Sequence, residues 1–90
     1  MFQVHLIISG KVQGVFYRAL CQEAAQRLGL TGWVSNLSTG QVEVLAKGEK
    51  EKIEKLIEWC KKGSPGAKVD IIDVEWQAVV HQVSSFNIKG

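Results

Sequence analysis

An arginine that follows a glycine-containing loop is the first feature of this chain that could do chemistry. Residues 10–18 read GKVQGVFYR and lie between an apolar run at residues 2–8 and a helix-like run at residues 17–28. The N–H groups in the first turn of a helix have no intrahelical partner, and the helix dipole makes that end positive. Arg18 adds a planar set of donors that fits a phosphate or a carboxylate. The order of strand, loop and helix therefore predicts an anion site, most simply for phosphate.

The loop itself supports this interpretation, although it does not require it. Gly14 has no Cβ at a point where the backbone must curve around a ligand. Consecutive N–H groups from Gly14 to Arg18 could converge on one anion. The same residues are compatible with a tight strand–helix turn that leaves the arginine on the surface.

Asn36 is the second candidate, because it closes an expected strand at residues 31–36 and borders residues 36–40, which have turn composition. An asparagine at such a place often only satisfies backbone groups of the turn. If the first loop and this strand lie close together, however, a neutral amide can hold a water molecule by donating and accepting hydrogen bonds. Arg18 and the loop N–H groups would then hold the phosphate.

Periodic patterns predict the elements that must position these residues. Alternating apolar residues indicate strands, and apolar residues at helical spacing indicate helices; we expect strands at residues 2–8, 31–36, 41–47, 69–76 and 86–88, and helices at residues 17–28 and 49–62. Gly29 is expected to end the first helix in a left-handed conformation. A change of alternation near Ile71 predicts a β-bulge or a bend there.

This order, βαββαβ with a further short strand, predicts the α+β class and a ferredoxin-like sandwich. We expect an antiparallel sheet of four to five strands with both helices on one face. Ninety residues are enough for one small core, so residues 1–90 should form a single domain. Because many unrelated functions share this fold, it says little about activity.

Composition excludes several classes of function. The net charge of +2 is too small to indicate a nucleic-acid partner, and the expected strand at residues 41–47 has no aromatic residue for stacking on RNA. No apolar run or leader indicates a membrane, so we expect a cytoplasmic protein. Because no long apolar strand edge is obvious, we also expect a monomer. Cys21 and Cys60 are not spaced as a metal or redox pair and are expected to be buried free thiols. The alternative is a disulfide between the two helices, if the faces that carry the cysteines meet. His5 and His81 have no plausible nucleophile partner.

Two segments together resemble the signatures of the acylphosphatase family. Residues 10–18 resemble the first signature, and residues 32–48, which begin GWVSNLSTGQV, resemble the second. Their spacing, the chain length and the order of elements agree with the family over the whole domain. Ser35 departs from it, since the family usually carries arginine, lysine or a similar longer residue there. In an extended strand this side chain points away from Asn36, so the change should alter surface charge rather than chemistry.

The resemblance implies hydrolysis of acyl phosphates to a carboxylate and inorganic phosphate, without a metal or other cofactor. It implies that Arg18 is the phosphate-binding catalytic residue and that Asn36 positions the attacking water. The substrate-binding residues would be Gln13, Gly14, Val15, Phe16, Tyr17 and Arg18. The alternative is a non-catalytic ferredoxin-like module that binds an anion or regulates a partner, although such a module would not need the amide of Asn36. The sequence does not identify the physiological substrate.

Overall fold

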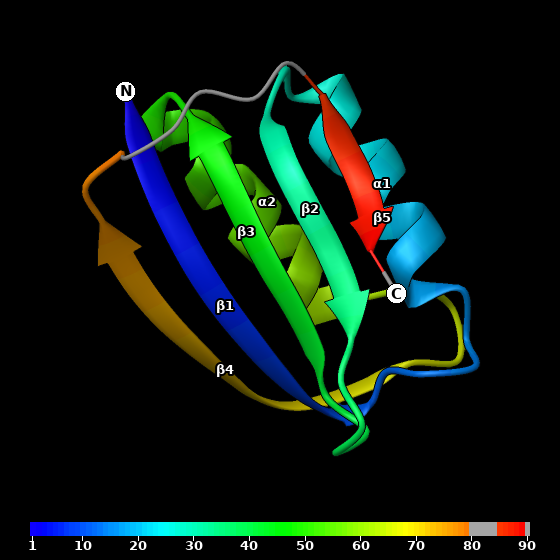
Figure 1. Cartoon of the computed structure of the whole chain (residues 1–90). Coiled ribbons are helices and arrows are strands. Elements are labelled where there is room, and N and C mark those ends of the chain that lie inside the picture. Colours follow the sequence, from blue (N-terminus) through cyan, green and yellow to red (C-terminus); the bar gives the residue numbers. More distant parts are fainter. Residues whose placement is uncertain (80–84, 90) are drawn as a thin grey trace.

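The protein is a two-layer sandwich in which two helices cover one face of a five-stranded sheet (Figure 1). A computed structural model describes residues 1–79 and 85–89, so His81 lies outside the described residues. The elements, in chain order, are β1 (Phe2–Lys11), α1 (Tyr17–Arg27), β2 (Thr31–Asn36), β3 (Val42–Gly48), α2 (Lys50–Lys62), β4 (Lys68–Gln77) and β5 (Phe86–Lys89). The expected α+β class and ferredoxin-like sandwich are confirmed.

The strands lie in the order β4-β1-β3-β2-β5. Neighbouring pairs are antiparallel except that β5 runs parallel to β2 at the edge of the sheet. β1 and β2 both pair with β3 and run in the same direction, so the loop that follows β1 and the end of β2 emerge at the same side of the sheet. This topology brings the two candidate segments together.

The expected bulge lies between β1 and β4. Ser9 pairs with Ile71 whereas Gly10 pairs with Val69, which leaves Asp70 as the extra residue on β4. Gly10 is required here, because a Cβ would lie 2.1 Å from the carbonyl oxygen of Lys68. The bulge bends β4 where it begins and lets both alternation patterns of the fourth strand stay in register.

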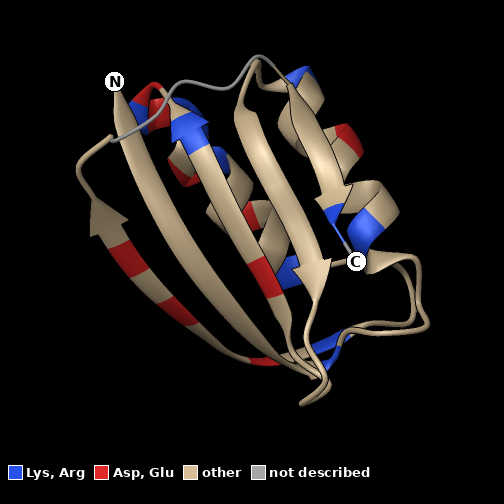
Figure 2. Cartoon of the chain, in the orientation of Figure 1, with Lys and Arg blue, Asp and Glu red and all other residues tan. Residues whose placement is uncertain are grey.

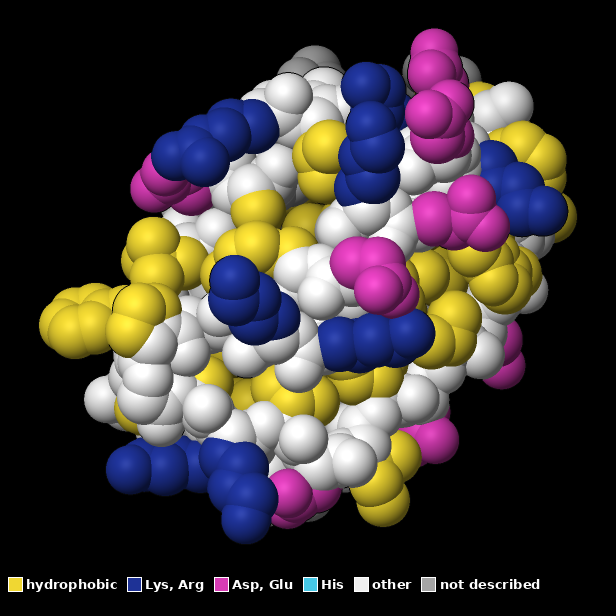
Figure 3. Space-filling view, turned by 180° about the vertical axis from the view of Figure 1, so that it is seen from behind, with side chains coloured by type: hydrophobic (Ala, Val, Ile, Leu, Met, Phe, Trp, Pro, Cys, Tyr) yellow, Lys and Arg dark blue, Asp and Glu magenta, His cyan; other side chains and the backbone are white. Residues whose placement is uncertain are grey.

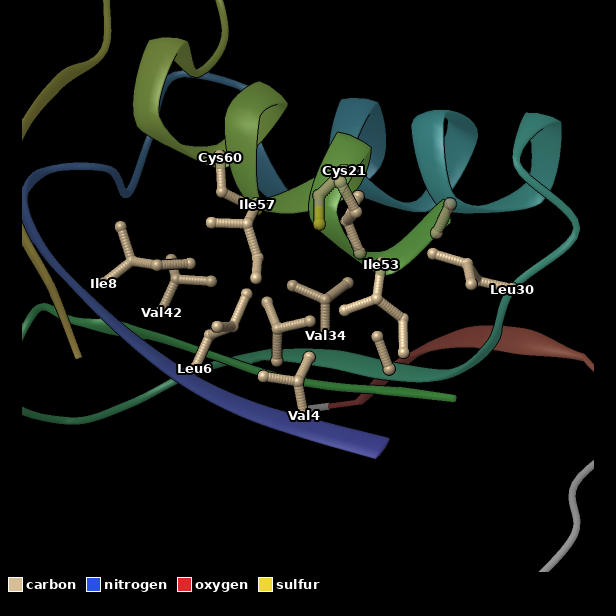
Figure 4. Packing of buried hydrophobic residues seen from close by; sticks show 14 of the residues in the cluster. Val4, Leu6, Ile8, Cys21, Leu30, Val34, Val42, Ile53, Ile57 and Cys60 are labelled. Carbon is tan, nitrogen blue, oxygen red and sulfur yellow. The ribbon is translucent and has the colours of Figure 1, made fainter. Parts of the chain in front are cut away.

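One hydrophobic core fills the space between sheet and helices (Figure 4). Alternate residues of β1 and β3 meet the apolar stripes of both helices, as their periodicity requires. Cys21 and Cys60 lie in this core as free thiols, as expected.

On the outer surface of the helices, positive and negative side chains are interspersed (Figure 3). Neither helix among the described residues has the length and apolar character needed to cross a bilayer.

Both helices end close to the expected positions. α1 ends at Arg27, one residue before the expected Leu28, and Gly29 follows with φ of 71°, the expected left-handed conformation. α2 begins at Lys50, with Glu49 as its N-cap residue. Of the helix termini, the N-terminus of α1 is the one that matters for the candidate site.

Candidate active site

The loop from β1 to α1 has an unusual backbone. Gly14 has φ of 75° and Phe16 has φ of 60°, and Phe16 is the only non-glycine residue with positive φ in the described ranges. A bulky residue avoids this left-handed conformation unless its surroundings impose it, and such strain collects at functional sites. Two left-handed residues in so short a loop turn its backbone sharply just before the helix starts.

The N-terminus of α1 is open to an external acceptor. Phe16 is the N-cap residue and provides no side-chain hydrogen bond to the helix, and no acidic residue lies in the first turn. The N–H groups in the first turn of a helix have no intrahelical acceptor, and here Phe16 provides no capping side chain either. An anion would supply both the missing acceptors and a favourable charge.

Three side chains form hydrogen bonds that tie the loop and the start of α1 to distant parts of the chain. Gln13 Nε2 donates to the carbonyl oxygens of Leu37 and Gln41, each at 2.8 Å, and so ties the loop to the β2–β3 turn. Ser64 Oγ donates to the carbonyl oxygen of Val15 at 2.6 Å. The hydroxyl of Tyr17, which begins α1, donates to the carbonyl oxygen of Cys60 at 2.7 Å. The loop is therefore pre-organised by contacts with distant parts of the chain.

The start of α1 lies near the ends of β2 and β5 at one corner of the sandwich (Figure 1). A pocket of about 280 Å³ opens between residues of these elements and of the loop before α1. Most of the predicted site residues line it, together with the unpredicted Val12, Ala19 and Ile88. The predicted residues in the lining are Gln13, Gly14, Phe16, Tyr17, Arg18 and Asn36. Arg18 is the only charged residue in this set, and Figure 2 shows basic but no acidic segments at this corner. The pocket is thus suited to an anion.

Val15 is the predicted substrate-binding residue that does not line the pocket. Its side chain packs against the hydrophobic core, so only its backbone is available to an anion in the pocket. Tyr17 is 1% exposed, and its hydroxyl is directed at Cys60 rather than at a ligand. Burial raises the pKa of Tyr17, which keeps that hydroxyl protonated as a donor.

Ile88 lines the pocket although it lies far along the chain from the predicted loop and from Asn36. It pairs with Val34 in β2, two residues before Asn36, and therefore lies on the same face of the sheet. This placement depends on the partner and direction of β5, which a strand of four residues does not reveal. Ile88 and Phe16, which are 41% and 81% exposed, give the pocket an apolar rim.

Asn36 carries a buried acceptor that no other group satisfies. Its Oδ1 is inaccessible and has no hydrogen-bond partner among the described residues. A buried polar atom without a partner costs roughly 1–3 kcal/mol, so the position is suited to a ligand or a bound water. Ser35 pairs with Glu43 and lies on the opposite face of the sheet from Asn36, as alternation predicts.

Other polar clusters lie elsewhere. His5 Nε2 is 2.7 Å from Glu43 Oε2 on the sheet face away from the helices, and neither residue lines the pocket. Among the described residues, no group of three or more histidine, cysteine, aspartate or glutamate side chains is arranged to hold a metal ion.

Comparisons with known proteins agree on one family. A family model described as acylphosphatase matches residues 4–88. An acylphosphatase of Methylococcus capsulatus is 44% identical over 88 residues, which cover 98% of this chain and 96% of that protein. An acylphosphatase of Pelotomaculum thermopropionicum is 43% identical over 86 residues, 96% of this chain and 94% of that protein. The crystal structure of acylphosphatase from Bacillus subtilis has a TM-score of 0.97 at 37% identity, with both chains covered completely.

Proposed function

The chain belongs to the acylphosphatase family, and on this premise we propose that Arg18 and the loop N–H groups bind the phosphoryl group while Asn36 positions the attacking water. The protein is an acylphosphatase: it hydrolyses acyl phosphates to a carboxylate and inorganic phosphate. The observation that carries the assignment of residues is the pocket in which Arg18, the start of α1 and Asn36 meet.

Phosphate binding is assigned to the segment from Gly14 to Arg18. The uncapped first turn of α1 supplies N–H donors and the positive end of the helix dipole. The guanidinium of Arg18 supplies a full charge and paired donors, and none of the other described residues that line the pocket is charged. These groups would also stabilise the charge on the phosphoryl oxygens in the transition state.

Water positioning is assigned to Asn36. Its buried, unpaired Oδ1 can accept a hydrogen bond from water, and its amide nitrogen can donate one. Because Asn36 ends β2 and Arg18 lies in the first turn of α1, the two groups approach the pocket from different elements. A water held by Asn36 could therefore lie in line with the bond from phosphorus to the acyl oxygen.

The reaction needs little else from the protein. The water oxygen forms a bond to phosphorus, the bond from phosphorus to the acyl oxygen breaks, and the electron pair leaves with the carboxylate. A carboxylate is a good leaving group, so no general acid is required. We assign the proton of the water to a phosphoryl oxygen of the substrate, and we propose that no metal takes part because Arg18 and the N–H groups supply the positive charge.

We also propose that the protein acts in the cytoplasm as a monomer. The two core cysteines are unpaired, and their thiols are close enough for a hydrogen bond that raises the pKa of Cys21, which suits a reducing compartment. The exposed edge of β4 carries Asp70, Asp73 and Glu75, which oppose edge-to-edge pairing of two copies. Sedimentation equilibrium would test the oligomeric state.

Hydrolysis in water labelled with oxygen-18 tests the proposed chemistry. An aromatic acyl phosphate is the substrate, and an aryl phosphate monoester serves as the control for general phosphatase activity. Attack at phosphorus places the label in inorganic phosphate, whereas attack at the carbonyl carbon places it in the carboxylate. Label in the carboxylate would overturn the assignment of the water to the phosphoryl group. No observation favours the non-catalytic anion-binding module.

A further inference from the structure

We infer that Ser64 is a positioning residue for phosphoryl transfer, because its hydroxyl orients the peptide unit between Val15 and Phe16 so that the Phe16 N–H faces the anion site. This inference rests on the proposed function of the loop. Ser64 does not line the pocket and would act only through the backbone that it holds.

The hydrogen bond itself is short and protected. Ser64 is 4% exposed, and its Oγ donates to the carbonyl oxygen of Val15 at 2.6 Å across 49 residues of sequence. In a trans peptide unit, the carbonyl oxygen of one residue and the N–H of the next point in opposite directions. The described residues contain no cis peptide bond. A hydroxyl on the oxygen of Val15 therefore leaves the Phe16 N–H directed away from Ser64.

From the residues that line the pocket, we place it on that opposite side. Gly14 and Phe16 line the pocket, whereas Val15 and Ser64 do not. Ser64 instead lines a separate groove between the helices, together with Leu20 and residues near the end of α2. The Phe16 N–H, directed away from Ser64, is thus directed toward the pocket that contains Arg18.

Such a constraint is needed because the loop is strained. The peptide unit in question lies between Gly14 and Phe16, both left-handed, and a strained backbone persists only where its surroundings determine it. Ser64 is itself held firmly: its carbonyl oxygen accepts a hydrogen bond from the Ala67 N–H at 3.0 Å. Gly63 before it packs against the ring of Tyr17, where an added Cβ would lie 3.0 Å from a ring carbon.

The test compares Ser64→Ala with Ser64→Thr, which keeps a hydroxyl. Ser38→Ala, at an exposed serine of the β2–β3 turn, is the matched control. For Ser64→Ala we expect inorganic phosphate to inhibit about fivefold less well, the effect of one lost hydrogen bond. The kcat should fall by about tenfold to a hundredfold, as expected when a reacting group is misplaced. Ser64→Thr should recover most of both losses.

Two readouts separate positioning from stability. The thermal midpoint of each variant is measured beside its kinetics, and the amide resonance of Phe16 is followed by nuclear magnetic resonance while phosphate is added to the wild-type protein. Unchanged phosphate inhibition and kcat in Ser64→Ala, with only a lower midpoint, would overturn the inference. A Phe16 amide that does not respond to phosphate would overturn it even if Ser64→Ala does not fold. An inactive wild-type protein would instead overturn the proposed function.

Discussion

Replacing Asn36 with alanine should separate phosphate binding from turnover. The substitution removes the amide that we assign to the attacking water and leaves Arg18 and the first turn of α1 unchanged. If the assignment is right, the variant keeps a complete anion site but no longer orients its nucleophile.

The expected magnitudes follow from the environment of Asn36. Its Oδ1 is buried without a partner. Removing such an atom removes a cost of roughly 1–3 kcal/mol to the folded state, and this gain offsets the packing energy lost on truncation. The free energy of unfolding should therefore change by less than about 1 kcal/mol. Loss of a group that acts mainly in the transition state should lower kcat by about 10²- to 10³-fold. Inhibition by inorganic phosphate should change by no more than about twofold, because no ligand of the phosphate is removed.

The assay is steady-state hydrolysis of an aromatic acyl phosphate, with inorganic phosphate as competitive inhibitor and urea unfolding as the measure of stability. Asn87→Ala is the matched control, because Asn87 is an exposed asparagine of β5 whose amide donates to Ser85 Oγ at 3.0 Å, away from the pocket. This control should behave as the wild type. A parallel loss of phosphate inhibition and kcat in Asn36→Ala would make Asn36 a phosphate ligand. A kcat near the wild-type value would refute its assigned role.

Three further predictions follow from the same structure. Arg18→Ala should lower kcat/KM by about 10³-fold or more and abolish phosphate inhibition, since it removes both charge and oriented donors; near-normal hydrolysis would contradict this. Chelators should leave activity intact, and a loss of activity that added metal restores would overturn the metal-free proposal. Finally, burial raises the pKa of Tyr17, and the hydrogen bond with Cys60 raises the pKa of Cys21. Above the ordinary thiol pKa of 9.0, the unfolded chain loses protons that the folded state keeps. The contribution of these groups to the free energy of unfolding should therefore be fully present below that pH and should fall as the pH rises above it. Thermal midpoints that stay constant into the alkaline range would contradict this.

Most of the fold could be predicted because it follows from periodicity. Alternation and helical spacing placed both helices and the first four strands, and the change of alternation near Ile71 indicated the bulge that the structure has at Asp70. The placement of β5 could not be predicted. A strand of four residues with two apolar side chains does not specify its partner or direction, which depend on the edge of the sheet that is left unpaired.

The candidate site could be predicted from residue type, whereas the backbone conformation of its loop could not. Arg18 and Asn36 were singled out from the sequence, and the topology brings both to one pocket. The left-handed backbone of Phe16 had no signal, because bulky residues rarely adopt it. Ser64 lies in a Gly-Ser-Pro-Gly segment that indicates only the end of a helix, and its contact with Val15 depends on tertiary structure.

A crystal structure with bound phosphate would show directly whether Arg18 and the loop hold the phosphoryl group. We expect phosphate oxygens about 2.7–3.2 Å from N–H groups of residues 14–18 and from the guanidinium of Arg18. We also expect the Asn36 amide to contact a water on the side of the phosphorus opposite the leaving oxygen. A phosphate bound away from the start of α1, or bound directly to Asn36 with Arg18 turned away, would contradict these expectations.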